Sequence, residues 1–584
     1  MNYPPSDVPC SPAADASPQE ATPARSSAGG LEKYAGMILA VAASALMLCG
    51  LNNTDFHGAD EPRYAEVTRE MLETGDYVLL RFNGVEYPNK PPLYFWLAAA
   101  CSKLTGGVNA VSARLPSALA GVAAVLLTFA LGRRMFGTRA GFLAGMVLLA
   151  TLYFLSFTRS VHMDVPLTAF TVAMIAVFYL AHERGRAAWW TWPAFFFLGL
   201  LGVLMKGPAG FLPALLSCMA FSLLTRDWRA WRRSLWISAF VFVAVVCLWL
   251  ALLWRLSSTD FIWNTLFSQN VERLAGARGH VGPFYFFLAA FPKMFLPWTP
   301  FFLIALVMAA RTWRRDESAR KIILIIVWFA VTFIFFSAVP SKRQLYLLPA
   351  FPAAAIATAW LLDALIAGKA PKGIEAFTRW VAAATAALAA AAPVALLALA
   401  WVEVKGDEQV GGIIADLRRH YIALAILSML LCAQGLAGAQ AAAQRRWART
   451  VTALLLICLT SGAATMFMFF PLLDKAKSAR NFSARLNEAA GDSEVAAYAA
   501  VPEWAVFYAH RKLILLETPE EAAAYLNGGD GAARFCLTRA KHVSKIKTAC
   551  RGMAAPEEVF EDKVEGDEMA LLKSGAPAGQ IDLP

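Results

Sequence analysis

The chain has 584 residues, of which 58% are hydrophobic, with a mean hydropathy of +0.50 and a formal net charge of +11. Soluble globular chains contain fewer apolar residues, so this composition excludes an ordinary soluble protein. The positive charge does not by itself indicate nucleic-acid binding, because the cationic residues cluster in short segments between apolar runs, as they do in membrane proteins.

The N-terminal part of the chain changes from a polar tail to membrane-spanning segments. Residues 1–30 are rich in Pro, Ser and Ala and have no core pattern, which predicts a disordered cytoplasmic tail. The apolar run at 35–51 has no A-x-A-like site close behind it, so we expect a retained signal anchor. Apolar runs of spanning length recur up to residue 473, and we interpret 31–473 as a polytopic α-helical transmembrane domain. The thirteen predicted spans are 35–51, 112–132, 140–157, 165–182, 189–204, 208–224, 235–254, 284–309, 322–338, 345–366, 378–402, 421–441 and 449–471.

Lysine and arginine residues lie in the loops that follow the even-numbered spans. The first three of these loops contain, among others, Arg133, Arg184 and Arg229. The positive-inside rule makes this side cytoplasmic, so we expect region 474–584 to be periplasmic. The run 93–104 is too short to cross, and we predict an interfacial helix there, within the first outer loop 52–111.

The C-terminal region predicts a small α/β domain. The stretches "EVAAYAA", "KLILLE", "ARFCLTRA" and "EMALLKS" have strand character, and "TPEEAAAYL" is typical of a helix. Thr518 would cap that helix, with Glu521 at its third position completing a capping box. Cys536 and Cys550 could pair if the domain faces an oxidising compartment, but spacing alone does not decide the geometry.

The first outer loop is the most highly charged segment between spans. It reads "DFHGADEPRYAEVTREMLETGDYVLLRFNGVEYPNKPPLYFW". Asp60 lies where a helix is expected to begin, and the helix macrodipole favours an anion there. Lys90 lies between two prolines, Pro88 and Pro91, which stiffen the backbone around it. Three further charged residues follow in the same predicted helix, Glu66, Arg69 and Glu70. We expect them to lie on a solvated helix surface at least as readily as in a functional site.

Single charges recur at the outer ends of later spans. They lie in "RSVHMDVPL", "VLMKGPAG", "FSQNVERL" and "PSKRQLYLLP". Any one of them could be a snorkelling anchor at the bilayer surface. Because all of them map to one face of the membrane, most beside Pro or Gly, we predict a site for an anionic substrate there.

These motifs resemble a known family in order along the chain. "GADEPRYAEVTREMLETGDYVLLRFNGVEYPNKPPLYFW", "RSVHMDVPLTAF", "LMKGPAG" and "PSKRQLYLLPAFP" are similar to segments of lipid-carrier-dependent glycosyltransferases. These are the aminoarabinose (4-amino-4-deoxy-L-arabinose) lipid A transferases and their relatives, extending to the protein O-mannosyltransferases. The resemblance implies a GT-C fold in the bacterial inner membrane, with the active site on the periplasmic face.

The resemblance also implies substrates and a reaction. The donor would be a sugar on polyprenyl (undecaprenyl) phosphate, and the acceptor lipid A or a related envelope lipid. A one-step transfer would invert the anomeric centre. Protein O-glycosylation with the same carrier stays an alternative. A lipid or sugar transporter is a third reading, weakened because the charges lie at span ends and no repeated halves are visible.

The resemblance assigns roles to residues position by position. Asp60 and Asp164 match the family's acidic residues of the first two outer loops, which makes them the catalytic candidates. The candidates for holding the carrier phosphate are Lys90, Lys206, Arg273 and Tyr346. The remaining substrate-pocket candidates are Glu61, Arg63, Tyr87, Asn89, Lys342 and Arg343.

One position departs from the aminoarabinose branch. Those enzymes usually read Glu-Lys-Pro where this chain has Asn89, Lys90 and Pro91. A carboxylate would favour the amine of an amino-sugar, whereas an asparagine suits hydroxyl groups. The departure therefore weakens the inference that the sugar is an amino-sugar, and any inference that the site holds a metal ion. No cofactor is expected to be required, and a divalent cation with unknown ligands is left open.

Overall fold

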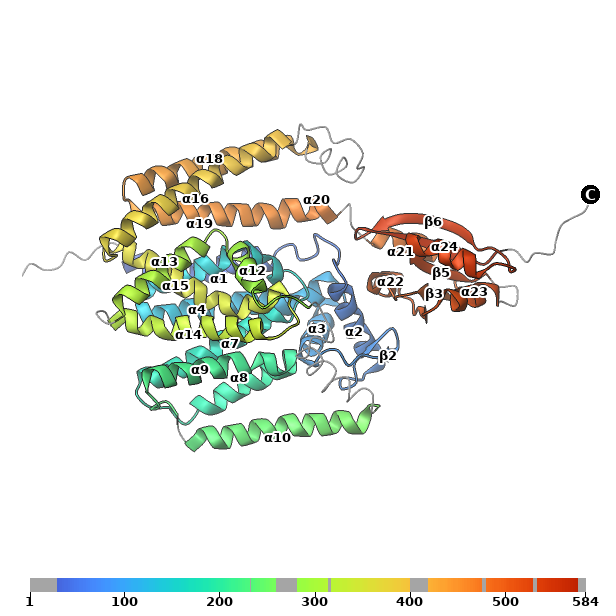
Figure 1. The fold of residues 1–584 in the computed structure, drawn as a ribbon, viewed down its shortest axis with the longest axis horizontal. Coiled ribbons are helices and arrows are strands. Elements are labelled where there is room, and N and C mark those ends of the chain that lie inside the picture. Colours follow the sequence, from blue (N-terminus) through green and yellow to red (C-terminus); the bar gives the residue numbers. More distant parts are fainter. Residues whose placement is uncertain are drawn as a thin grey trace, which may run out of the picture.

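The fold consists of a bundle of long helices with a small α/β unit at one end (Figure 1). The computed structural model describes residues 29–231, 233–258, 281–313, 317–399, 418–474, 479–528 and 533–575. Most of the predicted tail, and the predicted site residue Arg273, lie outside these residues.

The bundle is made of apolar helices that run along the long axis of the molecule (Figure 1). Its helices are α1 (Gly29–Leu48), α4 (Ala110–Phe136), α5 (Thr138–Leu149), α6 (Leu152–Thr158), α7 (Asp164–Glu183), α8 (Thr191–Lys206), α9 (Leu212–Thr225), α10 (Arg233–Leu256), α12 (Phe286–Met294), α13 (Thr299–Thr312), α14 (Glu317–Ala338), α15 (Phe351–Ile366), α16 (Lys372–Leu399), α18 (Tyr421–Ala443), α19 (Trp447–Ala464) and α20 (Phe470–Asp474). Short 3-10 segments precede α9 and α15, at η1 (Gly207–Gly210) and η3 (Gln344–Ala350), and a π-helical turn, η4 (Thr465–Phe469), joins α19 to α20.

Each of the thirteen predicted spans overlaps a helix of this bundle, and the end of the span 378–402 lies outside the described residues. Among the described residues, nine helices are long and apolar enough to cross a bilayer. Two bent pairs, α5 with α6 at 69° and α12 with α13 at 111°, are broken spans or re-entrant loops. The shorter apolar helices α1 and α9 match two further predicted spans. The multi-span fold class is thereby confirmed, and the exact count of thirteen stays a prediction.

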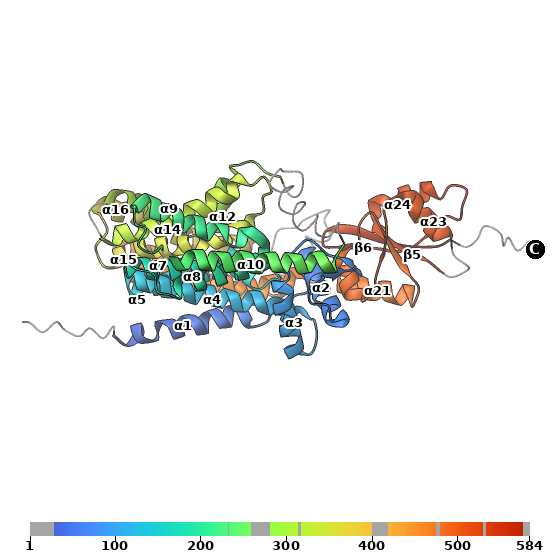
Figure 2. The same ribbon diagram turned by 90° about the horizontal axis from the view of Figure 1, so that it is seen from below.

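Two helices show the extremes of packing within the bundle. The apolar window of η3 and α15 is 94% buried inside the protein, so this segment forms the centre of the bundle. The corresponding window of α10 is only 6% buried, although it has the highest mean hydropathy. Figure 1 shows α10 at the edge of the bundle, and Figure 2 shows it lying across one side. Such an apolar, unburied helix is stable only in lipid.

The first outer loop folds into two helices and a short hairpin. These are α2 (Asp60–Thr74), β1 (Arg81–Phe82), β2 (Val85–Glu86) and α3 (Leu93–Thr105). The 13-residue α3 matches the run predicted to be too short to span. Tyr64, Tyr94 and Phe95 form the buried aromatic core between α2 and α3.

The C-terminal unit is a five-stranded mixed sheet with the strand order β4-β3-β5-β7-β6. Its elements are α21 (Arg480–Ala490), β3 (Val495–Tyr498), α22 (Glu503–Ala509), β4 (Ile514–Leu516), α23 (Pro519–Asn527), β5 (Phe535–Arg539), α24 (Ala540–Ala549), β6 (Glu557–Val564) and β7 (Asp567–Lys573). Strands β3, β4 and β5 are parallel, and β7 pairs antiparallel with β5 and β6.

Alternating side chains of the strands build a core on each face of this sheet. Val495 and Ala497 pack toward α21 and α22, whereas Ala496 and Tyr498 pack toward α23 and α24. Figure 2 shows helices on both sides of the sheet. The four predicted strands are present, and Thr518 Oγ1 accepts a hydrogen bond from the Glu521 amide at 3.1 Å. The Glu521 carboxylate accepts instead from the amide of Glu517, the residue before the N-cap, so only half of the predicted capping box is formed. Strand β6 and the helices α21, α22 and α24 were not predicted from the sequence.

The cysteines of this unit do not form a disulfide in the structure. Cys536 and Cys550 are both free thiols, and both are buried in the core between the sheet and α24. They contribute to this core as small apolar side chains.

Candidate functional site

Six of the predicted residues line one cavity at the end of the bundle nearest the C-terminal unit. They are Asp60, Lys90, Asp164, Lys206, Arg343 and Tyr346. A neighbouring cavity of about 430 Å³ shares four of them and adds Arg63, Tyr87 and Asn89. Asp60 and Arg343, which are 283 residues apart in the sequence, therefore meet at one point.

Helix ends position the charged groups of this site. Asp60 is the first residue of α2, Asp164 is the first residue of α7, and Lys206 is the last residue of α8. Carboxylates at helix N-termini and a cation at a C-terminus are the arrangement that the helix macrodipole stabilises. Gly207 ends α8 with a φ of +72°, which a residue with a side chain rarely adopts.

Asp60 lies between two arginines. Its Oδ2 accepts a hydrogen bond from Arg343 Nη1 at 2.8 Å, and its Oδ1 lies 3.8 Å from Arg63 Nη1. Burial raises the pKa of Asp60, but the charges of Arg343 and Lys90 outweigh it and hold that pKa below its ordinary value. Asp60 is therefore ionised at neutral pH.

A second ion pair lies on the other wall of the cavity. Lys206 Nζ donates to Asp164 Oδ1, and the ammonium also lies 4.3 Å from the centroid of the Tyr346 ring. Packing of α7 against both α8 and η3 brings these three side chains together. The cation–π contact and the ion pair hold Lys206 in one orientation, pointing into the site.

Lys90 lies in the loop between β2 and α3. It lines both cavities, and its charge acts on the Asp60 carboxylate. Tyr87 and Asn89 lie beside it on the wall of the larger cavity, and burial raises the pKa of Tyr87 to about 12. The tyrosine is thus a neutral hydrogen-bonding group at physiological pH.

Glu61 does not line either of these cavities. Its carboxylate accepts hydrogen bonds from Arg114 Nε at 3.0 Å and Arg114 Nη2 at 2.8 Å. It also accepts from the backbone amides of His57 and Val161 at 3.0 and 2.7 Å. The predicted substrate role of Glu61 is therefore replaced by a structural one, since its hydrogen-bonding capacity is filled by the protein.

Lys342 also differs from the expectation. Its side chain is buried, and Nζ donates to the carbonyl oxygens of Phe336, Ser337 and Val339 at the end of α14. The ammonium thereby satisfies carbonyls that a helix end leaves without intrahelical partners. Lys342 is a helix-capping residue, and it is its neighbour Arg343 that reaches the cavity.

The match with known proteins is partial in sequence and extensive in fold. The dolichyl-phosphate-mannose-protein mannosyltransferase family matches residues 89–254. An uncharacterized protein of Aquifex aeolicus is 30% identical over 336 residues, which are 56% of this chain and 64% of that protein. The undecaprenyl phosphate-alpha-4-amino-4-deoxy-L-arabinose arabinosyl transferase of Aeromonas salmonicida is 26% identical over 332 residues, 55% of this chain and 59% of that enzyme. The chain thus matches about three-fifths of the length of these relatives.

The likeness in three dimensions extends over almost the whole chain. The crystal structure of ArnT from Cupriavidus metallidurans bound to undecaprenyl phosphate has a TM-score of 0.72 to this structure, at 19% identity. The match covers 92% of this chain and 98% of that one. The chain has the GT-C fold.

Within this GT-C fold, sequence reasoning missed several residues around the site. His162 lines both cavities and is half-buried, and its buried Nδ1 makes no hydrogen bond with any residue that the structure describes. Glu503 of the C-terminal unit forms an ion pair with Arg63. The position of His162 in the motif "RSVHMD", two residues before the candidate Asp164, could have indicated that it lies near the site. Nothing local to Arg114 or Glu503 indicated their partners.

The side chains available as metal ligands around Asp60 and Asp164 do not favour the binding of a divalent cation. Each of the two cavity carboxylates, Asp60 and Asp164, is already bound to a cationic side chain. In the part of the chain that the structure describes, no three His, Cys, Asp or Glu side chains are grouped as metal ligands. No step of the chemistry is therefore assigned to a metal.

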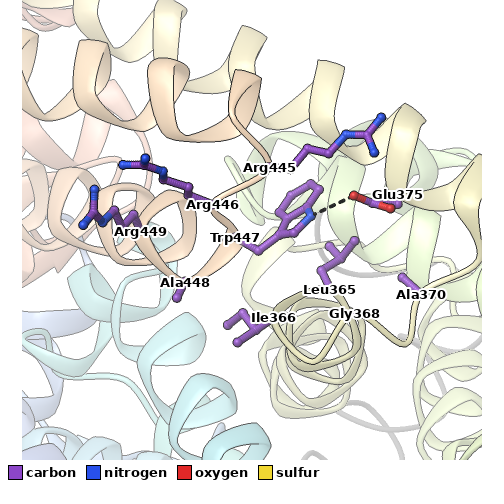
Figure 3. A pocket seen from close by; sticks show the side chains of 10 residues that line it. All are labelled: Leu365, Ile366, Gly368, Ala370, Glu375, Arg445, Arg446, Trp447, Ala448 and Arg449. Atoms are coloured by element: carbon purple, nitrogen blue, oxygen red, sulfur yellow. Dashed lines mark hydrogen bonds between the residues drawn. The ribbon is translucent and has the colours of Figure 1, made fainter.

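Another cavity, of about 510 Å³, lies at the opposite end of the bundle (Figure 3). Trp447 crosses it and donates to Glu375 at 3.4 Å. Figure 3 shows Arg446 and Arg449 extending to one side, away from Arg445. Because these arginines diverge, they do not form a binding site for one anion, and they match the basic loops expected on the cytoplasmic side.

Proposed function

We propose that this protein is an inverting glycosyltransferase that moves a sugar from a polyprenyl phosphate carrier to lipid A or a related envelope lipid on the periplasmic face. The observation that carries the proposal is the convergence of Lys90, Lys206 and Arg343 on one cavity beside the ionised Asp60. The fold shared with an enzyme crystallised with undecaprenyl phosphate supports this class of donor.

The excess of cations suits a lipid phosphate. In the two cavities, Arg63, Lys90, Lys206 and Arg343 face the carboxylates of Asp60 and Asp164. A sugar phosphodiester carries one negative charge, and a second develops on the phosphate as the sugar–oxygen bond breaks. Cations fixed around that oxygen stabilise the transition state more than the ground state.

The transfer can be written as one displacement. An acceptor oxygen attacks the anomeric carbon, the bond between that carbon and the phosphate oxygen breaks, and the electron pair leaves with the polyprenyl phosphate. If the acceptor is a hydroxyl, its proton passes to Asp60 as general base. If the acceptor is a lipid A phosphate, it is already an anion, and Asp60 and Asp164 then orient the surrounding cations.

The sugar is the least constrained part of the proposal. Tyr87 and Asn89 present neutral hydrogen-bonding groups next to Lys90, which suit sugar hydroxyls. An aminoarabinose donor is supported by the similarity to the arabinosyl transferases, but the site lacks the carboxylate those enzymes usually have beside the lysine. On the strength of that similarity we propose 4-amino-4-deoxy-L-arabinose as the first sugar to test. A neutral hexose, which the neutral groups beside Lys90 suit, is the second.

A protein acceptor is the second candidate. The match of residues 89–254 to the protein mannosyltransferase family favours it, because that family uses the same kind of carrier to modify proteins. A transporter is disfavoured because the ion pairs lie at helix ends and not midway along the spans.

The test uses the full chain reconstituted in nanodiscs. It is given undecaprenyl phosphate-linked aminoarabinose or mannose together with lipid A or a serine-rich peptide, and all species are followed by mass spectrometry. We expect a sugar mass increment on lipid A and free undecaprenyl phosphate. An increment on the peptide alone would favour the second candidate, and no transfer by folded protein would overturn the glycosyltransferase proposal.

Two controls sharpen this experiment. Asp60→Asn should strongly slow transfer, whereas Glu73→Gln, at an exposed carboxylate on the same helix, should not. A topology reporter fused after Leu473 should be active only in the periplasm. Activity of that reporter only in the cytoplasm would overturn the proposed orientation.

A further inference from the structure

A second polar cavity lies in the C-terminal unit, at the carboxyl ends of its parallel strands. It has a volume of about 410 Å³, within the roughly 300–1,000 Å³ typical of ligand pockets. Its walls include Tyr498 at the end of β3 and Arg539 at the end of β5. Helix α22 follows β3 and leads to β4, on one side of the β3–β5 pair. Helix α24 follows β5 and leads to β6 and β7, on the opposite side of that pair. The crevice between such adjacent strands is where open α/β sheets bind ligands.

The floor of this cavity contains polar atoms without protein partners. Thr538 is 1% exposed, and its Oγ1 makes no hydrogen bond with any described residue. His542 lies in the first turn of α24, and its Nδ1 atom is likewise buried and makes no hydrogen bond within the described part of the chain. Leaving a buried hydroxyl unsatisfied costs free energy, so a ligand that bonds to both groups would be favoured.

The other walls combine aromatic rings with side chains of both charges. Trp504 and Tyr498 supply the rings. The charges come from Glu503, Glu565, Asp567 and Arg539, and Arg539 is paired with Asp567. Both signs of charge beside aromatic faces suit a sugar, whose hydroxyls donate and accept and whose C–H faces pack on rings. A purely anionic ligand would instead be repelled by the carboxylates.

The cavity is joined to the site around Asp60. Ala59 lines both this cavity and the larger cavity of the bundle. Glu565 Oε1 accepts a hydrogen bond from the Gly58 amide at 2.9 Å, and Glu503 is paired with Arg63, which faces Asp60. A molecule held here would lie next to the carboxylate, on the side of Arg63 and away from Arg343.

We propose that this cavity of the C-terminal unit binds the sugar headgroup of the acceptor lipid and presents it to Asp60. The inference rests on the proposed function, because it assigns the acceptor to a separate place from the carrier phosphate. The carrier phosphate is held by the cations of the bundle, and the acceptor headgroup by Thr538, His542 and the surrounding rings. Ala59 marks the boundary where the two substrates meet.

The test measures binding separately from transfer. The full chain in nanodiscs is titrated calorimetrically with an uncharged N-acetylglucosamine disaccharide, which represents the sugar part of the acceptor headgroup, and with inorganic phosphate. Thr538→Val removes the unpartnered hydroxyl and should weaken disaccharide binding about tenfold, the value of roughly one hydrogen bond, without lowering the unfolding temperature. Ala500→Trp fills the cavity and should abolish binding. Ala524→Trp, at an exposed position of α23 that does not line this cavity, is the matched control.

Each outcome has a distinct meaning. Wild-type binding that Ala500→Trp abolishes and Ala524→Trp preserves supports the inference. Unchanged binding in Thr538→Val and Ala500→Trp, or competition by inorganic phosphate at equal affinity, overturns it. If wild-type protein transfers sugar and Ala500→Trp has the same KM for lipid A, the acceptor site is refuted while the function stands. If the variants lose headgroup binding but wild-type protein transfers no sugar, the function is refuted while the binding site stands.

Discussion

Two arginine–carboxylate pairs lie one residue apart at the start of α2, and they differ in burial and in how completely they are satisfied. The Asp60 and Arg343 side chains are 17% and 36% exposed, whereas those of Glu61 and Arg114 are 4% and 3% exposed. Every oxygen of Glu61 is bonded within the protein, while Asp60 faces a cavity lined by additional cations. The comparison shows that neighbouring carboxylates of one motif divide into a buried, fully bonded group and a group that faces a cavity.

The largest expected effect concerns the exposed pair. Asp60→Asn keeps the shape of the side chain but removes its charge and its basicity. We expect kcat to fall by roughly 10²–10⁴, the usual contribution of a general base, while the unfolding temperature changes little. Single-turnover transfer to a hydroxyl acceptor measures this loss. A residual rate within twofold of the wild type would contradict the catalytic assignment of Asp60.

The buried pair should respond in the opposite way. Glu61→Gln leaves the Arg114 charge buried without its partner, which typically costs about 3–5 kcal/mol of stability. We expect a lower unfolding temperature but a near-normal kcat per folded molecule. The double variant Glu61→Gln with Arg114→Met should recover part of the stability, because it removes both buried charges. If fully folded Glu61→Gln showed a large decrease in kcat, Glu61 would have a direct role in catalysis, contrary to this prediction.

A third carboxylate of α2 tests the contact with the C-terminal unit. Burial raises the pKa of Glu66 to about 7, although Arg69 pairs with it and also donates to the carbonyl oxygens of Val506 and Phe507. A raised folded-state pKa means that stability is highest below about 4.5 and falls as the pH rises toward 7. Glu66→Gln should remove this fall, roughly 2–3 kcal/mol across the window.

Thermal unfolding measured from pH 4.5 to pH 8 checks this prediction for Glu66. Glu73→Gln is the matched control, because that side chain is 66% exposed on the same helix. Parallel pH curves for wild type and Glu66→Gln would show that Glu66 does not titrate in this window.

The smallest expected effect is a shift in pH dependence. Arg343 is the charge that lowers the pKa of Asp60 most, so Arg343→Gln should raise that pKa. Since the reaction with a hydroxyl acceptor needs ionised Asp60, the acid limb of kcat/KM should move to higher pH. An acid limb that stays in place, at whatever overall rate, would show that Arg343 does not control the ionisation of Asp60.

Much of the site could be predicted from the sequence because helix ends constrain where a charge lies. Asp60, Asp164 and Lys206 were recognised at the outer ends of helices, and the alternation of spans brings all such ends to one face. In the structure these three side chains line one cavity, and their role in catalysis stays a prediction. Sequence reasoning could not separate Arg343 from Lys342, since adjacent residues point in different directions once η3 packs on the bundle.

Contacts between residues that are far apart in the sequence could not be predicted in this way. Arg114 contacts Glu61 because α2 packs beside α4, 53 positions along the chain. Glu503 reaches Arg63 only because the C-terminal unit docks on the first outer loop, through contacts such as that of Phe56 with Phe507. No periodicity or motif near these residues specifies the partner.

By itself, the sequence determined the apolar spans, the faces on which their charged ends lie, and the strands of the C-terminal unit. These depend on local hydrophobicity and periodicity, which are written in each segment. Only the tertiary structure decided that Asp60 faces a cavity while Glu61 is buried. It also decided that Thr538 lines the cavity of the C-terminal unit, together with Ala59. Burial and hydrogen-bond satisfaction are properties of packed surfaces, and they arise only when distant segments come into contact.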